Sequence, residues 1–155
     1  MDIFEVLSRS NAPKAKKVVY LDAEAVQDVE RLIKEQADAD VIKEAVKRRD
    51  ASKLTFHLQS VTADVREELM IGIESADKTK NKTKRVSEAY LALLSKTLYK
   101  IEDAEGNSDE RRFNSEEIRK ILNALPGEQY LGLLVCAMNL LGASADYDNA
   151  VTVDF

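Results

Sequence analysis

The stretch FNSEEIRKILNALPGEQYLGLLVCAMNLLG, residues 113–142, predicts a pair of helices separated by a Pro-Gly turn. Asn114 or Ser115 can cap the first helix, because a side-chain oxygen at that position accepts a hydrogen bond from a free backbone N–H. Pro126 and Gly127 end this helix. Its apolar residues recur at helical spacing and are Ile118, Ile121, Leu122 and Leu125.

The second helix is apolar around most of its circumference, and Gly142 is expected to end it. A helix with one solvated face needs only a narrower apolar stripe. We therefore expect this helix either to lie at the centre of the core or to contact a partner protein. Its apolar residues are Tyr130, Leu131, Leu133, Leu134, Val135, Met138, Leu140 and Leu141.

Composition places the chain among folded proteins with one core. It has 155 residues, of which 45% are hydrophobic and 33% charged, and a single domain typically has about 100 to 200 residues. We expect residues 1–16 to form an N-terminal segment and linker, residues 17–142 a single α-rich domain, and residues 143–155 an acidic flexible tail. Within the first segment, the apolar residues of MDIFEVL predict a short docking helix.

Charge and cysteine content bear on partners and compartment. The formal net charge of −5 gives no global attraction to nucleic acid or to an anionic membrane. Cys136 is the only cysteine, so no disulfide can form within the chain, and its apolar neighbours predict a buried, reduced thiol. No apolar run reaches the roughly 20 residues that span a bilayer, and the first residues lack a secretory signal.

Two segments predict strands within a mainly α fold. Residues 17–21 (KVVYL) are rich in β-branched and aromatic residues, and residues 54–58 (LTFHL) alternate apolar and polar side chains, as a half-buried strand does. The expected fold is therefore α+β, a helical domain with a two-stranded β piece from Val18–Leu21 and Leu54–Leu58. Alternatively, these strands complete a sheet between subunits.

The remaining segments predict helices and loops. Asp22 can cap a helix over residues 23–49, which has no Gly or Pro and is either one helix or two. A helix is expected after Thr62 or Asp64, and another over residues 86–102. Residues 77–85 form a basic polar loop, and residues 102–112 a solvated one.

No constellation of residues indicates catalysis. His57 is the only histidine, so it cannot build a zinc site of three or four nitrogen and sulfur ligands with Cys136 alone, and we expect it to be structural or exposed. Cys136 has no adjacent base to activate it. Residues 103–114 alternate acidic side chains but lack the glycine and glutamate of a calcium loop. Because no phosphate-binding glycine motif is present either, we expect no enzyme, no cofactor and no metal.

Two segments have an alternative binding role. The cations of the basic loop, Lys78, Lys80, Lys82, Lys84 and Arg85, suit phosphate contacts, but no aromatic residue lies among them to stack on bases. The acidic tail carries four spaced apolar residues, Tyr147, Val151, Val153 and Phe155. It is either an unattached end or a segment that adds to a partner's sheet or groove, and these four residues are our candidate partner-binding residues.

Four segments, read in order, resemble the tail assembly chaperones of long-tailed (siphovirus-type) bacteriophages, especially those of actinobacterial phages. They are KVVYLDAEAVQDVERLIKE, KLTFHLQSVTADVREEL, SEAYLALLSKTLYKIEDAEG and FNSEEIRKILNALPGEQYLGLLVCAMNL, and the likeness covers about residues 17–141. The matching positions near the end are Ser115, Glu116, Glu117, Leu125, Pro126, Gln129 and Asn139. Members often carry a tryptophan in the penultimate helix, where this chain has Ile118.

The resemblance implies a non-enzymatic chaperone that binds and solubilises the tape measure protein and helps to recruit tail tube proteins during tail assembly. It implies a homo-oligomer, sometimes accompanied by a longer frameshifted form of the chain, in the host cell cytoplasm and absent from the mature virion. The alternatives are a structural head-tail connector, neck or other virion component, and a nucleic-acid-binding regulator.

Overall fold

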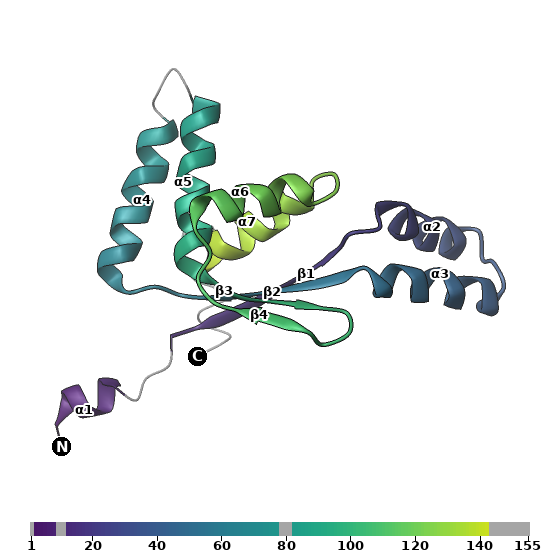
Figure 1. Cartoon of the computed structure of the whole chain (residues 1–155), viewed down its shortest axis with the longest axis horizontal. Helices are drawn as coiled ribbons and strands as arrows, with labels where there is room; N and C mark the ends of the chain where they lie inside the picture. The colour runs from purple at the N-terminus through teal and green to yellow at the C-terminus, as the bar shows by residue number, and fades with distance from the viewer. Residues whose placement is uncertain (1, 9–11, 78–81, 143–155) are drawn as a thin grey trace.

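The computed structural model describes residues 2–8, 12–77 and 82–142 (Figure 1). Four antiparallel strands form one sheet in the order β1-β2-β3-β4. They are β1 (Lys14–Tyr20), β2 (Lys53–Gln59), β3 (Leu98–Asp103) and β4 (Ser108–Glu110). The mainly α fold with a small β element is confirmed, and the two expected strands do pair as β1 and β2, but the sheet has two further strands.

The helices lie between β1 and β2, between β2 and β3, and at both ends of the described chain. They are α1 (Ile3–Ser8), α2 (Ala23–Lys34), α3 (Ala39–Ala51), α4 (Ala63–Asp77), α5 (Lys82–Thr97), α6 (Ser115–Ala124) and α7 (Gln129–Leu140). The open question over residues 23–49 resolves into two helices. Gln36, between them, has a φ of 54°, a left-handed conformation that an α-helix does not tolerate.

The prediction of a helix over residues 86–102 was wrong at its C-terminal end. Helix α5 ends at Thr97, whose Oγ1 donates a hydrogen bond to the Leu93 carbonyl at 2.9 Å, and the chain continues directly as β3. This strand pairs with the edge of β2 opposite to β1. Because a buried strand needs partners for its backbone groups on both edges, the sheet overrides the helical periodicity of the sequence. The expected solvated loop over residues 102–112 likewise contains β4.

Two predicted helix caps, Asp22 and Asn114, are confirmed. The Asp22 side chain accepts a hydrogen bond from the Ala25 N–H at 3.0 Å and begins α2. Asn114 begins α6 with a capping box, in which its side chain accepts from the Glu117 N–H at 2.9 Å and the Glu117 side chain accepts from the Asn114 N–H at 3.1 Å. Gly127, with a φ of 58°, lies in the turn between α6 and α7.

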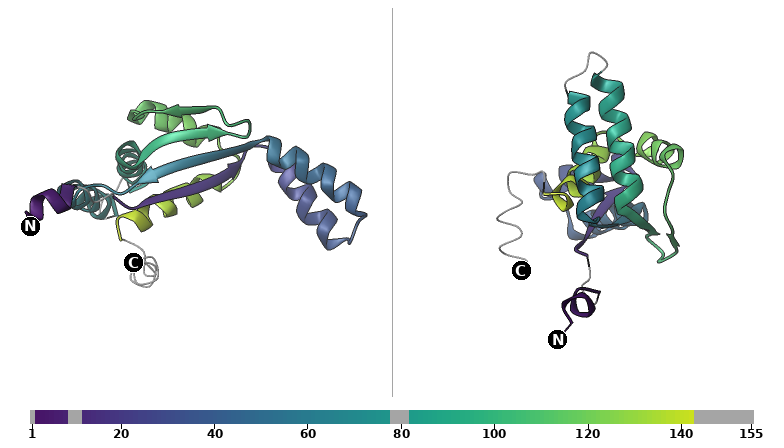
Figure 2. Two further views of the ribbon diagram at one scale, coloured as in Figure 1. Left: turned by 90° about the horizontal axis from the view of Figure 1, so that it is seen from below. Right: turned by 90° about the vertical axis from the view of Figure 1, so that its left-hand side faces the viewer.

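Helices α5, α6 and α7 lie against one face of the sheet, and the strands stand in front of them when the sheet is viewed from the other side (Figure 2). The core between them contains Phe56, Leu58, Leu93, Leu94, Leu98, Ile118, Leu133 and Leu141, all fully buried. The opposite face carries no helix from the described residues. The α2–α3 hairpin extends beyond the end of the sheet, and α1 lies beyond the other end (Figure 1).

Candidate protein-binding surfaces

His57 lies on the helix-free face of the sheet, where its environment is structural. The residue is only 6% exposed, whereas the sequence predicts a half-buried β2. Its Nε2 lies 3.2 Å from Glu102 Oε1, and its ring centroid lies 6.2 Å from that of Tyr99. A buried imidazole whose ring nitrogen is hydrogen-bonded to a carboxylate is a packed polar group.

Cys136 is partly buried at the edge of the core, and not fully buried as predicted. Burial raises the pKa of its thiol, and the nearby Lys17 ammonium acts in the opposite direction without overcoming this effect. A thiol with a raised pKa holds less of the reactive thiolate at neutral pH. The environment of Cys136 therefore matches the packing role that the sequence predicts.

The acidic alternation after Asp103 belongs to the β3–β4 turn. Asp103 Oδ1 accepts hydrogen bonds from the N–H groups of Glu105 and Asn107, both at 2.9 Å. Desolvation opposes ionisation of Asp103, but the hydrogen bonds from Asn107, Glu105 and Gly106 outweigh it and lower the pKa of this carboxyl. Over the described ranges, no three His, Cys, Asp or Glu side chains are arranged to hold a metal ion.

Helix α1 exposes an apolar surface at one end of the molecule. Ile3, Phe4 and Leu7 are 60%, 77% and 58% exposed. Residues at spacings of three and four share one side of a helix, so Ile3 and Leu7 form a stripe with Phe4 beside it. A helix of six residues has too few internal hydrogen bonds to be stable by itself. This short apolar helix is therefore suited to contact with another protein surface.

Helix α7 lies in the core on one side, and the predicted contact with a partner protein stays a prediction for its other side. Leu133, Leu134 and Ala137 are buried in the core. Leu131 and Val135 are 43% and 57% exposed on the other side of the helix. Since these two residues are four positions apart, they form a short apolar stripe in solvent.

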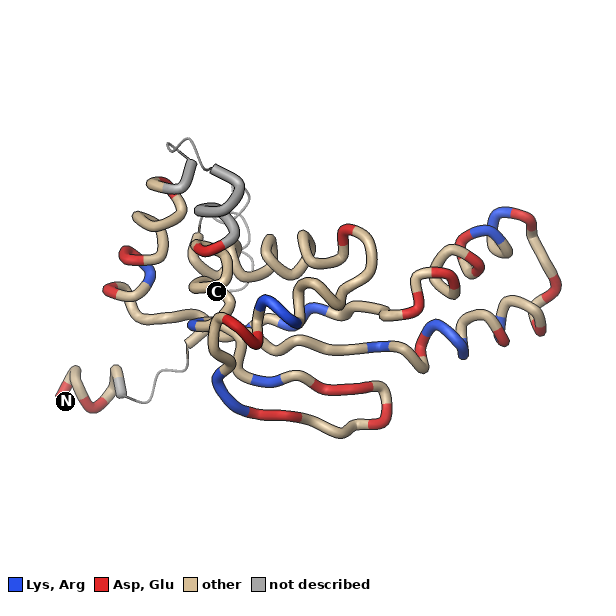
Figure 3. Tube along the Cα trace, turned by 45° about the horizontal axis from the view of Figure 1, so that its top comes forward, with Lys and Arg blue, Asp and Glu red and all other residues tan. Residues whose placement is uncertain are grey.

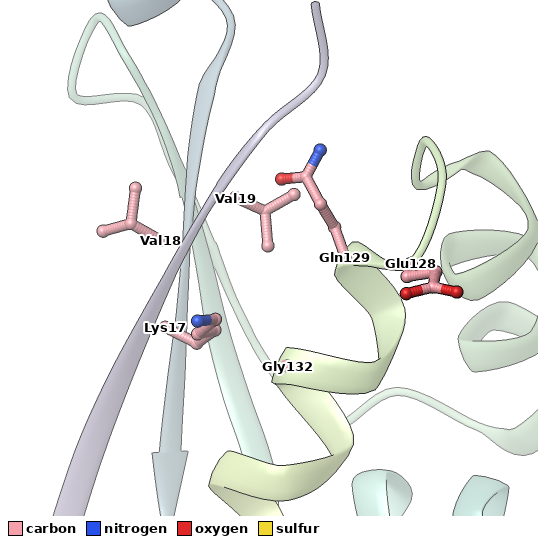
Figure 4. Close-up of a pocket in the computed structure, with 6 residues that line it drawn as sticks. All are labelled: Lys17, Val18, Val19, Glu128, Gln129 and Gly132. Atoms are coloured by element: carbon pink, nitrogen blue, oxygen red, sulfur yellow. The ribbon is translucent and has the colours of Figure 1, made fainter. Parts of the chain in front are cut away.

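A groove separates α7 from β1 (Figure 4). At one end, Gln129 lies against the Tyr20 backbone, from which it accepts an N–H at 2.9 Å and to which it donates at 2.7 Å. Further along, the Lys17 side chain crosses α7 at Gly132, where an added Cβ would lie 2.9 Å from Lys17 Cε. A side chain at position 132 would therefore displace Lys17. No sequence pattern predicts this groove, because Tyr20 and Gln129 on its two walls are 109 residues apart.

Helices α2 and α3 pack mainly against each other and make few contacts with the rest of the domain. Ala25 and Val29 of α2 are buried, α3 buries no residue, and Ile33 and Val41 are exposed. Arg48 of α3 lies 3.0 Å from Asp22, 3.4 Å from Asp28 and 3.5 Å from Glu24. Acidic and basic residues recur along both helices of this hairpin (Figure 3).

The candidate residues of the tail, Tyr147, Val151, Val153 and Phe155, lie outside the described residues. So do Lys78 and Lys80 of the basic segment. Lys82, Lys84 and Arg85 lie on α5, which begins at Lys82 inside the expected loop, but their side chains are not described. The predictions made for these two segments stay predictions.

Comparisons with protein-family models, with curated proteins and with solved structures find no match. In the part of the chain that the structure describes, no helix is long and apolar enough to span a membrane. The candidate surfaces therefore rest on the geometry of this chain alone.

Proposed function

We propose that this chain is a non-enzymatic tail assembly chaperone of a long-tailed bacteriophage, which binds the tape measure protein, keeps it soluble and helps to recruit tail tube subunits. The resemblance of four segments to that family motivates the proposal. The structural observation that supports it is the apolar surface of α1, where Phe4 is 77% exposed. Apolar side chains that are exposed side by side, unlike single exposed ones, mark contact sites for other proteins.

A chaperone of this kind must hold its client weakly enough to release it. Three apolar side chains on a short helix supply a modest contact, which a polymerising tube subunit can displace by competition. Linkage of several such contacts in an oligomer raises the total affinity without strengthening any single one. The chain requires no nucleotide in this scheme.

Co-expression with the tape measure protein of the same genome tests the proposal. We expect a larger soluble fraction of tape measure protein than in cells without this chain, and co-elution of the two by size exclusion. A triple variant, Ile3→Ser, Phe4→Ser and Leu7→Ser, should lose most of this rescue. The matched control is Ile71→Ser, which removes an apolar side chain that is 56% exposed on α4 and should retain the rescue.

Three outcomes would contradict the proposal. An insoluble tape measure protein beside a stable ring of this chain alone would favour a head-tail connector, and stable incorporation into purified virions would favour any structural component. Salt-sensitive retention on DNA that depends on the cations of residues 78–85 would favour the nucleic-acid alternative.

A further inference from the structure

The outer edge of β1 is open along most of its length. Leu21 donates to the Ser52 carbonyl at 3.1 Å, and Ser60 donates to the Pro13 carbonyl at 2.8 Å, so the odd-numbered residues of this segment bond toward β2. Backbone groups alternate in direction along an antiparallel pair, and the register is continuous. Lys14, Lys16 and Val18 therefore direct their N–H and C=O groups away from the sheet, as Tyr20 does.

Among the described residues, hydrogen bonds cover this edge only at its C-terminal end, at Tyr20. Gln129 bonds both outward groups of Tyr20, as a neighbouring strand would. No other described residue bonds the outward groups of Lys14, Lys16 and Val18. The opposite edge of the sheet, β4, has only three residues, and all are exposed and polar. Short polar edges resist added strands. The seven residues of β1 leave room for one, and its lysines repel a cationic strand but not an acidic one.

The exposed stripe of α7 lies beside the same edge. Gly132 contacts Lys17 of β1, and Val135 follows Gly132 by three positions, so the two are neighbours on the helix surface. Glu128 and Gln129 line the groove together with Val18 and Val19, and its volume is about 290 Å³. A strand added to β1 would lie over this groove, with every second side chain directed toward Leu131 and Val135.

The other side chains of an added strand would lie on the helix-free face. They would lie directly opposite those residues of β1 whose side chains are on the same face, at a Cβ separation of about 5 Å. Two of those residues are lysines, Lys14 and Lys16, both exposed and in no ion pair with a described residue. Carboxylates at these positions would pair with the lysines, whereas cations would be repelled.

We propose that the edge of β1 and the adjoining stripe of α7 bind an extended segment of a separate protein, in which apolar and acidic side chains alternate. The segment adds to the sheet as a further strand. Its apolar side chains cover Leu131 and Val135, and its carboxylates face Lys14 and Lys16. A second copy of β1 fits poorly, since it would bring three more lysines beside Lys14, Lys16 and Lys17. The inference does not depend on the proposed chaperone function.

Binding of a labelled synthetic peptide to the full-length protein tests this proposal. The probe has about eight residues, a typical strand length, with valine and aspartate in alternation. Its comparison peptide carries lysine in place of aspartate. We expect the acidic peptide to bind at least about tenfold more tightly, as measured by fluorescence anisotropy, because two of its aspartates face Lys14 and Lys16, which would repel lysines at the same positions. Equal affinity of the two peptides would overturn the charge argument.

Backbone and charge variants locate the site. Val18→Pro removes an outward N–H without touching a β1–β2 hydrogen bond, and should weaken binding of the acidic peptide about tenfold. The double variant Lys14→Glu, Lys16→Glu should weaken it as much or more. Its matched control is Lys43→Glu, Lys47→Glu, which makes the same change in net charge on exposed positions of α3 and should keep the affinity within about twofold.

Amide hydrogen exchange tests the proposal on the native protein, so the result does not depend on whether a variant folds. The Lys16 and Val18 amides should gain protection when the acidic peptide binds. The Tyr20 amide should be protected with and without peptide, because Gln129 already accepts its hydrogen bond. Unchanged exchange at Lys16 and Val18 in the peptide complex would overturn the proposal.

The chain's own residues 143–155 are the competing occupant, because they alternate acidic and apolar residues in part. If the peptide-free protein already protects the Lys16 and Val18 amides, and substitution of Asp146, Asp148 and Asp154 by lysine removes that protection, then this segment fills the edge. That result would overturn the assignment to a separate partner.

Discussion

Gln129 closes one end of the β1 edge with a side chain in place of a strand. Its two hydrogen bonds, at 2.9 and 2.7 Å, join the start of α7 to the end of β1. We expect Gln129→Ala to destabilise the fold by about 1–3 kcal/mol, because it leaves a backbone donor and a backbone acceptor unpaired in a partly buried position. Urea unfolding measures this change.

A control for Gln129→Ala is available on the projecting hairpin. Gln27→Ala removes the same side chain from an exposed position of α2, and its effect on the free energy of unfolding should stay within about 0.5 kcal/mol. A Gln129→Ala variant as stable as this control would show that water replaces both hydrogen bonds.

The Arg111–Glu117 pair predicts a pH dependence of stability. Arg111 Nη2 lies 2.6 Å from Glu117 Oε2, and this contact, together with the Asn114 N–H, lowers the pKa of the Glu117 carboxyl below 4.5. A lowered pKa means that the contribution is complete above about pH 4.5, the value in the unfolded chain, and is lost as the pH falls through the folded value. Glu117→Gln keeps the acceptor that caps Asn114 and removes the charge.

We therefore expect Glu117→Gln to be less stable than the native chain at pH 7, and the difference to shrink steadily as the pH falls below about 4.5. Thermal unfolding across this range at low salt measures it. Glu116→Gln, on the same turn of α6, is the control, since its side chain forms no ion pair with a described residue. A difference that stays constant with pH would contradict the charge assignment.

At the scale of elements, the sequence predicts the features that depend on neighbouring residues, and it misses those that depend on pairing between distant strands. The caps at Asp22 and Asn114, the β1 and β2 strands and the α6–α7 pair all follow from nearby residues. The α5–β3 boundary does not, because residues 98–102 continue the apolar spacing of the preceding helix and become a strand only through β2. The exposed stripe of α7 was anticipated as a possible contact, whereas the adjoining edge of β1 needed the sheet order.

Helix α1 should contribute little to the stability of the domain. Its apolar side chains are exposed and outside the core, so their removal creates no cavity. We expect the triple variant Ile3→Ser, Phe4→Ser and Leu7→Ser to unfold within about 0.5 kcal/mol of the native chain in urea. A loss of several kcal/mol would mean that α1 packs on the domain in solution, and it would weaken the assignment of α1 to partner binding.

At the scale of the described molecule, a cohesive core contrasts with a projecting hairpin that has few buried groups. The sheet and α5 to α7 share a large apolar core, whereas α2 and α3 bury only Ala25 and Val29 between them. Local stability follows the apolar area that a unit buries. We therefore expect amides of α2 and α3 to exchange through an opening of lower free energy than amides of β2 and α5, as measured by native-state hydrogen exchange.

Two variants separate these units. Leu133→Ala, at a fully buried core position, should lower the free energy of global unfolding by about 2–5 kcal/mol and reduce protection throughout the chain. Val29→Ala, at a buried position of the hairpin, should reduce protection in α2 and α3 and leave β2 and α5 unchanged. Equal loss in every element after Val29→Ala would mean that the hairpin unfolds only with the core. A hairpin that opens separately can instead adapt to a partner without any cost to the sheet, whose β1 edge stays in place for the segment that we propose it binds.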